Sequence, residues 1–173
     1  MRKSLKRRHS RGGNAMLETA LTIIPLLAIL CAIIDFSMAL FIRNSVELAC
    51  REGVRYAITG NTGAGGNACQ TASVKYIVQQ DAMGFLNGST GLSHIQVNYF
   101  NPTTLASTTS NAQGNIVQVS VTGISWLWML NGVWQNVNAV KNGPGTSYSG
   151  GITIGGASSD ILGPYALGIA PCQ

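Results

Sequence analysis

Charged side chains are scarce in this chain of 173 residues, of which they make up only 10%. Six of the 11 Lys and Arg residues precede Gly13, whereas none of the 6 Asp and Glu residues does. The 160 residues after Gly13 (173 − 13) therefore carry five basic (11 − 6) and six acidic side chains, a net charge of −1. The basic N-terminal block has no interleaved aromatic residues that could stack on bases, so we expect no nucleic-acid partner.

Residues that could carry out catalysis or bind a metal are also few. The chain has two histidines, one of them in the basic block, and its four cysteines lack zinc-ligand spacing. His94 has no serine or cysteine nucleophile pattern beside it. The carboxylates beyond the apolar segment form no spaced acid–base pair; they are Glu47, Glu52, Asp81 and Asp160. We therefore expect no enzymatic activity, no cofactor, no metal and no small-molecule substrate.

What the chain does have is a long apolar run from Leu17 to Ile42. Besides Glu18 near its start, the run is interrupted by Thr19, Thr22, Pro25, Asp35 and Ser37. Its 26 residues (42 − 17 + 1) exceed the roughly 20 that a helix needs to cross a bilayer. The basic block before it predicts a single pass with a cytoplasmic N-terminus and an outward-facing C-terminal head. The alternative is a secretory signal peptide cut near Ala39, which would give a mature chain without Glu18.

Beyond the apolar run the pattern becomes amphipathic. One helix face carries apolar residues and the other carries charged ones: Val46, Cys50, Val54 and Ala57 against Arg43, Glu47, Arg51 and Arg55. We predict one transmembrane and stalk helix over residues 14–58, kinked at Pro25. The segment Gly60–Gly66 lacks the Lys-Ser/Thr of a phosphate loop and is interpreted as a flexible linker.

The remaining residues, 67–173, are predicted to form an α+β head. A helix is expected from Ala68 to Phe85, capped by Asn67 and Gln70 and stopped at Asn87-Gly88. Alternating apolar residues predict strands, with a polar loop between the first two: His94–Phe100, Ile116–Thr122 and a short one at Ile152–Ile154, with the loop at Pro102–Gln113. The economical arrangement is this second helix packed on a small antiparallel sheet.

The cysteines and tryptophans give weaker signals. Cys31 lies in the membrane run, and Cys50 lies on the apolar helix face as a packing residue. Spacing leaves the disulfide pairing open, but we favour Cys69 with Cys172, which would hold the C-terminus against the second helix. The apolar stretch around Trp126 and Trp128 is expected in the core or at a partner interface rather than in lipid.

Glu18 is the most unusual residue, because it places a carboxylate just inside the membrane run. A charge in hydrocarbon is costly and normally has a partner. Cleavage after Gly13 would make Glu18 the fifth residue, as in type IV prepilins. Around it, Gly13-Asn14-Ala15-Met16-Leu17-Glu18-Thr19-Ala20-Leu21 and the later Arg51-Glu52-Gly53-Val54-Arg55-Tyr56-Ala57 stand behind the basic leader. In these blocks the first 60 residues resemble TadE-like minor pilins (pseudopilins) of the tight-adherence, or Flp, pilus system.

The resemblance implies a role and partners. A prepilin peptidase of the bacterial inner membrane would cut between Gly13 and Asn14, removing leader residues 1–13. Glu18 would then pair with an α-amine during assembly with other Tad pilins, in a pilus used for adhesion and biofilm formation. Arg51, Glu52, Arg55 and Tyr56 would serve in helix docking or partner contact. Thr19 stands where the family has an aromatic residue, and the chain exceeds the length of a major Flp pilin, so we expect a minor subunit.

Two further alternatives remain open. The chain resembles, less well, a pseudopilin of a type II secretion-like machine, against which the Arg51–Ala57 block argues. It is also compatible with a membrane-anchored extracytoplasmic binding module whose Trp-rich head recognises a surface or glycan. Exposed tryptophans would favour that module, and buried ones would exclude it.

Overall fold

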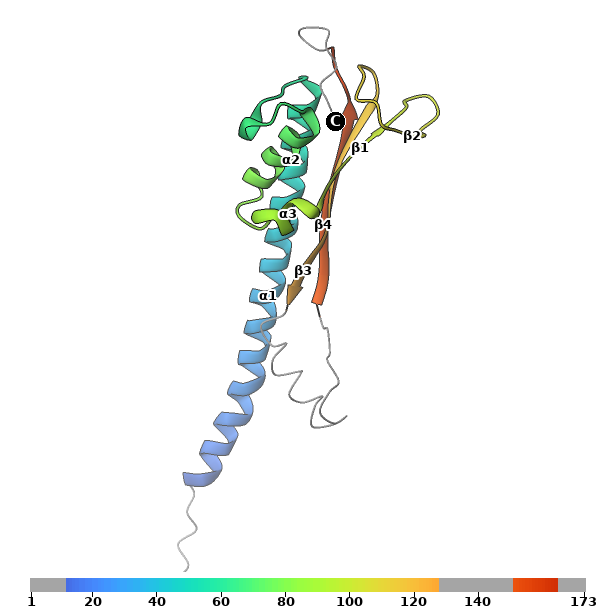
Figure 1. Ribbon diagram of the computed structural model, residues 1–173. Coiled ribbons are helices and arrows are strands. Elements are labelled where there is room, and N and C mark those ends of the chain that lie inside the picture. Colours follow the sequence, from blue (N-terminus) through green and yellow to red (C-terminus); the bar gives the residue numbers. More distant parts are fainter. Residues whose placement is uncertain (1–11, 128–150, 165–173) are drawn as a thin grey trace, which may run out of the picture. The chain divides into compact units, whose positions relative to one another are not determined.

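The computed structural model describes residues 12–127 and 151–164 (Figure 1). Its first element is the helix α1, Gly12–Ile58, which ends at the residue where the helical sequence pattern ends. Hydroxyl groups inside its apolar part donate to carbonyls of the preceding turn: Thr19 to Ala15 O (2.8 Å), Thr22 to Thr19 O (3.0 Å) and Ser37 to Ile33 O (2.7 Å). These bonds satisfy polar groups that would be costly to leave unpaired in hydrocarbon.

The chain divides into two compact units, residues 1–37 and residues 38–173. In the first unit, α1 is mostly apolar, and its only acidic or basic residues from Ala15 to Ser37 are Glu18 and Asp35. Its large apolar side chains are exposed, among them Leu21, Ile24 and Ile29. An 18-residue window of this helix has a mean hydropathy of 2.5 and is 11% buried, which makes it a candidate membrane span. The protein is thus suited to cross a membrane once through this segment.

The second unit is an α+β head, which confirms the predicted fold class. It contains the outer part of α1, the 3-10 turn η1 (Ala64–Gly66), α2 (Gln70–Asp81) and α3 (Gly88–Ser93). Its antiparallel sheet has the order β2-β1-β3-β4, formed by Ser107–Thr108, Ile95–Phe100, Ile116–Leu127 and Gly151–Ile161. Every second residue of a strand faces one side, which explains the alternation seen in the sequence.

One face of the sheet carries the core. The cross-strand pairs Ile95–Val121, Val97–Val119 and Tyr99–Val117 lie on this face, and β1 and β3 are buried there. Buried residues of α1 and α2 join them in a single hydrophobic cluster: Ile42, Val46, Cys50, Val54, Ala57, Val74 and Val78. The predicted apolar stripe of α1 is therefore the surface that packs in the head.

The predicted second helix is wrong at both ends. Asn67 does not cap it: Cys69 is the N-cap, and the Asn67 side chain donates instead to Ala64 O (2.9 Å). The helix stops at Asp81, because Met83 (φ 50) and Gly84 (φ 87) adopt left-handed backbone conformations that a helix excludes. The Phe85 ring packs edge-on against Phe41, with ring centroids 6.1 Å apart, and so anchors this turn to α1.

Other element boundaries also differ from the prediction. Asn87-Gly88 opens α3 rather than ending a helix, and the predicted polar loop contains β2. Strand β3 continues past Thr122 through a bulge at Gly123 (φ 84), since a glycine tolerates the conformation that the bulge needs. Strand β4 is much longer than the predicted Ile152–Ile154, because pairing with β3 stabilises its Gly- and Ser-rich residues. Trp126 of β3 is half-buried against the core, and Trp128 lies outside the described residues.

Candidate functional site

The predicted assembly residue Glu18 lies on α1, and its side chain is exposed. It is the only charged residue between Ala15 and Ile34. Thr22 donates to its backbone carbonyl (3.2 Å), so the neighbouring hydroxyl is used within the helix. The carboxylate therefore projects from an otherwise apolar helix surface. Such a group gains most from a cationic partner in the same low-dielectric setting.

The predicted cleavage residues Gly13 and Asn14 belong to the first turn of α1. Residues 1–11, which belong to the predicted leader, lie outside the described residues. Glu18 follows Asn14 by four positions, a little more than one helical turn. Cleavage between Gly13 and Asn14 would therefore create an α-amine about one turn from the carboxylate along the same helix.

The block Arg51–Ala57 packs against the rest of the head through its predicted apolar face and through Gly53, which the prediction did not single out. A Cβ atom added to Gly53 would overlap Val78 Cγ2 and lie 3.7 Å from Val119 Cγ1. Val54 and Ala57 are buried beside it. Gly53 thus marks the closest approach of α1 to α2 and the sheet. Its only sequence signal is a glycine in mid-helix, where glycine costs about 1 kcal/mol and normally has a packing reason.

The charged residues of this block point outward. Arg51 pairs with Glu47 at 2.8 Å, and Arg55 lies 3.9 Å from Glu52. Both arginine side chains are well exposed, at 65% and 76%, and exposed pairs of this kind contribute only about 0.2–1 kcal/mol. Tyr56 is half-buried and packs against the core. The two arginines are therefore available to a partner, whereas Tyr56 is part of the packed surface.

Three of these predicted residues share a cleft between α1 and α2. This cleft, of about 330 Å³, is lined by charged and polar groups: Glu52, Arg55, Tyr56, Thr59, Asn61, Ile77 and Asp81. Partial burial, together with the field of the Glu52 carboxylate, raises the pKa of Asp81 above its usual value. The prediction missed Asp81 as a member of this group. The sequence feature that could have identified Asp81 is that its carboxylate interrupts the apolar stripe of the second helix.

Gln70, predicted to cap the second helix together with Asn67, has another role: it is the first residue of α2 and does not cap the helix. Its side chain is fully buried, donates from Nε2 to Ala57 O (2.8 Å) and accepts from Asn111 Nδ2 (3.1 Å). It thus satisfies a backbone carbonyl in the last turn of α1, where carbonyl groups have no hydrogen-bond donor within the helix. Gln70 ties the end of α1 to α2 and to the segment before β3.

The cysteines fall into two groups. Cys31 and Cys50 are free thiols, and Cys50 is buried with its Sγ 3.5 Å from Gly156 O. Cys69 is disulfide-bonded. Cys172, its predicted partner, lies outside the described residues, so this pairing stays a prediction. Within residues 12–127 and 151–164, no three His, Cys, Asp or Glu side chains gather in a way that could hold a metal ion.

Comparison with known proteins identifies one part of the chain. A family model described as "TadE-like protein" matches residues 13–55, about a quarter of the sequence. The match covers Gly13, Glu18 and most of the Arg51–Ala57 block, and it lies entirely within α1. No curated protein and no solved structure matches the chain.

Proposed function

We propose that this protein, which is TadE-like over residues 13–55 and is thereby associated with the Tad pilus system, is a minor pilin that supports assembly of that pilus. One observation carries the proposal. The TadE-like segment lies within a single helix whose apolar part bears one exposed carboxylate, Glu18. An apolar helix of this kind can remain in the membrane or pack among copies of similar helices in a filament.

The proposed orientation follows from charge. The basic leader stays on the cytoplasmic side of the inner membrane, and the α+β head lies on the outer side. A prepilin peptidase cleaves between Gly13 and Asn14 and leaves a new α-amine at Asn14. The pilus then serves adhesion and biofilm formation. The protein acts as a structural subunit rather than an enzyme.

Glu18 drives assembly by pairing with an α-amine, on its own chain or on a neighbouring pilin. Two unit charges 4 Å apart attract by about 4 kcal/mol at an effective dielectric constant near 20. Removing one partner of such a pair leaves the other charge in hydrocarbon, which costs more than the pair contributes. Pairing therefore favours a subunit in register over one that is displaced along the helix axis.

A minor role suits this chain better than the shaft role. Thr19 turns its hydroxyl back to Ala15 O and offers no ring beside Glu18. The head adds a four-stranded sheet and further helices to the TadE-like segment. A head of this size favours a place at the base or tip, where fewer copies must pack together.

The test is the N-terminal residue and intact mass of the membrane-bound protein, with and without its prepilin peptidase. A peptidase-dependent start at Asn14 supports the proposal. A start at Leu40 would mean a secreted head, and a start at Met1 under both conditions would mean a permanent anchor. Either of these results would overturn the pilin assignment.

A second test uses Glu18→Gln, with Glu47→Gln as the matched control, since Glu47 pairs on the exposed surface of the head. We expect Glu18→Gln to reduce pili per cell at least tenfold while membrane levels of the protein stay unchanged. Glu47→Gln should leave piliation within about twofold. Equal piliation in the two variants would contradict a role for Glu18 in assembly.

A further inference from the structure

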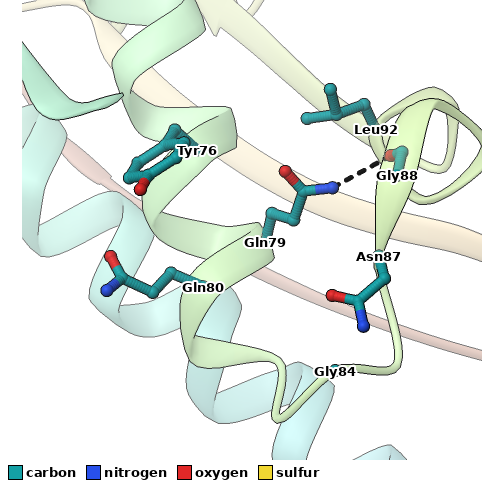
Figure 2. A pocket seen from close by; sticks show the side chains of 7 residues that line it. All are labelled: Tyr76, Gln79, Gln80, Gly84, Asn87, Gly88 and Leu92. Carbon is teal, nitrogen blue, oxygen red and sulfur yellow. Dashed lines mark hydrogen bonds between the residues drawn. The ribbon is translucent and has the colours of Figure 1, made fainter. Parts of the chain in front are cut away.

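A cleft between α2 and α3 has no place in the pilin proposal. It has a volume of about 480 Å³ and lies within the head (Figure 2). Its side chains come from Tyr76, Gln79 and Gln80 of α2, from Asn87 and from Leu92 of α3, and it is completed by Gly84 and Gly88. None of these residues is charged. The volume falls within the range of about 300–1,000 Å³ that is usual for small-ligand sites.

Tyr76 is the aromatic residue of this cleft, and the backbone of Gly65 lies close to its ring. A Cβ atom added to Gly65 would lie 2.5–2.8 Å from three carbons of the Tyr76 ring. Gly65 also has φ +63, so only glycine meets both demands without strain. The glycine-rich segment before α2 thus supports the ring, whose residue is still 39% exposed. This gives the cleft a fixed and accessible aromatic surface.

The amide groups of the cleft keep hydrogen-bonding capacity. Gln79 Nε2 donates to Gly88 O (2.9 Å; Figure 2) and also to Leu86 O (2.7 Å). These two bonds fix the orientation of the amide. Its Oε1 accepts no hydrogen bond from the described residues. The side-chain amides of Gln80 and Asn87 likewise make none within the described part of the chain. The cleft therefore presents one oriented acceptor and two amides, each of which both donates and accepts.

We propose that the α2–α3 cleft binds a neutral saccharide. A sugar ring offers adjacent hydroxyls that both donate and accept, which amide side chains can match in pairs. It also has an apolar C–H face, which packs on an aromatic ring such as Tyr76. The absence of charge in the lining disfavours phosphorylated and acidic ligands, which need cationic or backbone N–H partners. A peptide that binds by strand addition would need an open strand edge, and this cleft is built from helices and a turn.

Two kinds of glycan could supply such a neutral sugar ring. N-acetylated sugars occur in cell-wall strands, and plain hexoses occur in surface glycans. An exposed cleft with one aromatic ring binds weakly, so we expect a dissociation constant on the order of 1 mM. Weak sites of this kind become effective when many heads act together.

The test measures binding to the full chain in detergent micelles by saturation-transfer NMR and calorimetry. The probes are chitotetraose, maltotetraose and, as a non-sugar, tetra-alanine. Saturable binding of either oligosaccharide supports the proposal, and the preferred one identifies the source. Failure of both sugars to bind at 20 mM (about 20 times the expected constant), or preferential binding of tetra-alanine, would overturn it.

Variants then locate the site. We expect Tyr76→Ala to weaken sugar binding at least tenfold and Tyr76→Phe, which keeps the ring, less than threefold. Gly65→Ala should weaken binding about as much as Tyr76→Ala, because its Cβ displaces the ring. Gly66→Ala is the matched control: its φ is +77, but an added Cβ meets nothing within 4 Å. Equal effects of the two glycine variants would contradict the proposed support of the ring.

If a tyrosine or glycine variant unfolds, Gln80→Ala still tests the proposal. The Gln80 side chain is exposed and makes no hydrogen bond to the described residues, so its removal should leave the fold intact. It should weaken binding about threefold to tenfold with unchanged thermal stability. Unchanged affinity in both Gln80→Ala and Tyr76→Ala would place the sugar elsewhere and overturn the proposal. The readout is independent of pilus assembly, since the Glu18→Gln variant should bind sugar normally.

Discussion

The two halves of α1 are both apolar, yet their side chains meet different surroundings. Ile29, in the first unit, is 59% exposed, whereas Ile42, in the second, is 2% exposed. The first half is apolar around most of its circumference, and the second has one buried stripe with charged residues opposite. A helix that is apolar all round needs lipid or neighbouring helices, while a one-sided helix can pack on its own domain. Hydrophobicity alone therefore does not say what a side chain will touch.

The largest expected effect contrasts the same substitution in the two halves. Ile42→Ala should lower the free energy of unfolding of the head by about 2–5 kcal/mol, because it leaves a cavity in a closed core. Ile29→Ala should change it by less than about 0.5 kcal/mol, as an exposed position. The measurement is chemical denaturation of the full chain in micelles, followed by near-UV circular dichroism. Similar losses in the two variants would remove the distinction between the halves.

The next effect concerns the end of α1. Gln70→Ala should cost about 1–3 kcal/mol, since it leaves the Ala57 carbonyl and the Asn111 amide buried without this partner. Gln96→Ala is the control, because Gln96 is exposed on β1. Hydrogen exchange of the last turn of α1 should accelerate in the Gln70 variant alone. Unchanged exchange there would show that Gln70 does not fix the end of the helix.

Gly53→Ala should cost about 1–2 kcal/mol, the balance of overpacking against Val78 and the better helix propensity of alanine. Adding Val78→Ala to this variant should recover part of the loss, because it makes room for the new methyl group. The double-mutant cycle is measured by the same denaturation experiment. A stabilising Gly53→Ala would mean that α1 does not need its close approach to α2.

The smallest effect is electrostatic. The pKa of Asp81 is raised in the folded protein, so the folded state holds this proton more tightly than the unfolded state. Stability should therefore fall as the pH rises from the ordinary Asp value of 3.8 through the raised one. Asp81→Asn should remove this decline and stabilise the neutral-pH protein by less than about 0.5 kcal/mol, because the carboxylate is only slightly buried. Thermal melts at pH 3.5 and pH 7 compare the two proteins. The melting temperature of the variant should exceed that of the wild type by more at pH 7 than at pH 3.5, and an equal difference at both pH values would contradict the prediction.

Features with a local period were predictable. The apolar run and the helical stripe at Val46, Cys50 and Val54 depend on a repeat of 3.6 residues, and the inward-facing residues of β1 and β3 on a repeat of two. The candidate site was predictable to the extent that it lies within α1, because Glu18 and the Arg51–Ala57 block are contiguous signals. The α+β class followed from the order of these patterns.

The features of the head that the sequence did not predict share one cause. The end of α2 is set by a left-handed turn that Phe85 anchors on Phe41, and the burial of Gln70 is set by partners 13 and 41 residues away. Strand β4 exists through pairing with β3, which its glycines and serines alone would not predict. Contacts between distant residues override local propensity in each case.

The sequence by itself determined that a basic N-terminal block precedes one long apolar helix with a carboxylate near its start, and that an α+β head follows. Those properties depend on composition and short-range spacing, which the chain carries wherever it folds. Only the tertiary structure decided that Gly53 is a contact point, that Asp81 joins Glu52 in one cleft, and that the Gly65 backbone supports the Tyr76 ring. These arrangements bring together residues from different elements, and their energies come from close packing and local fields that no linear pattern encodes.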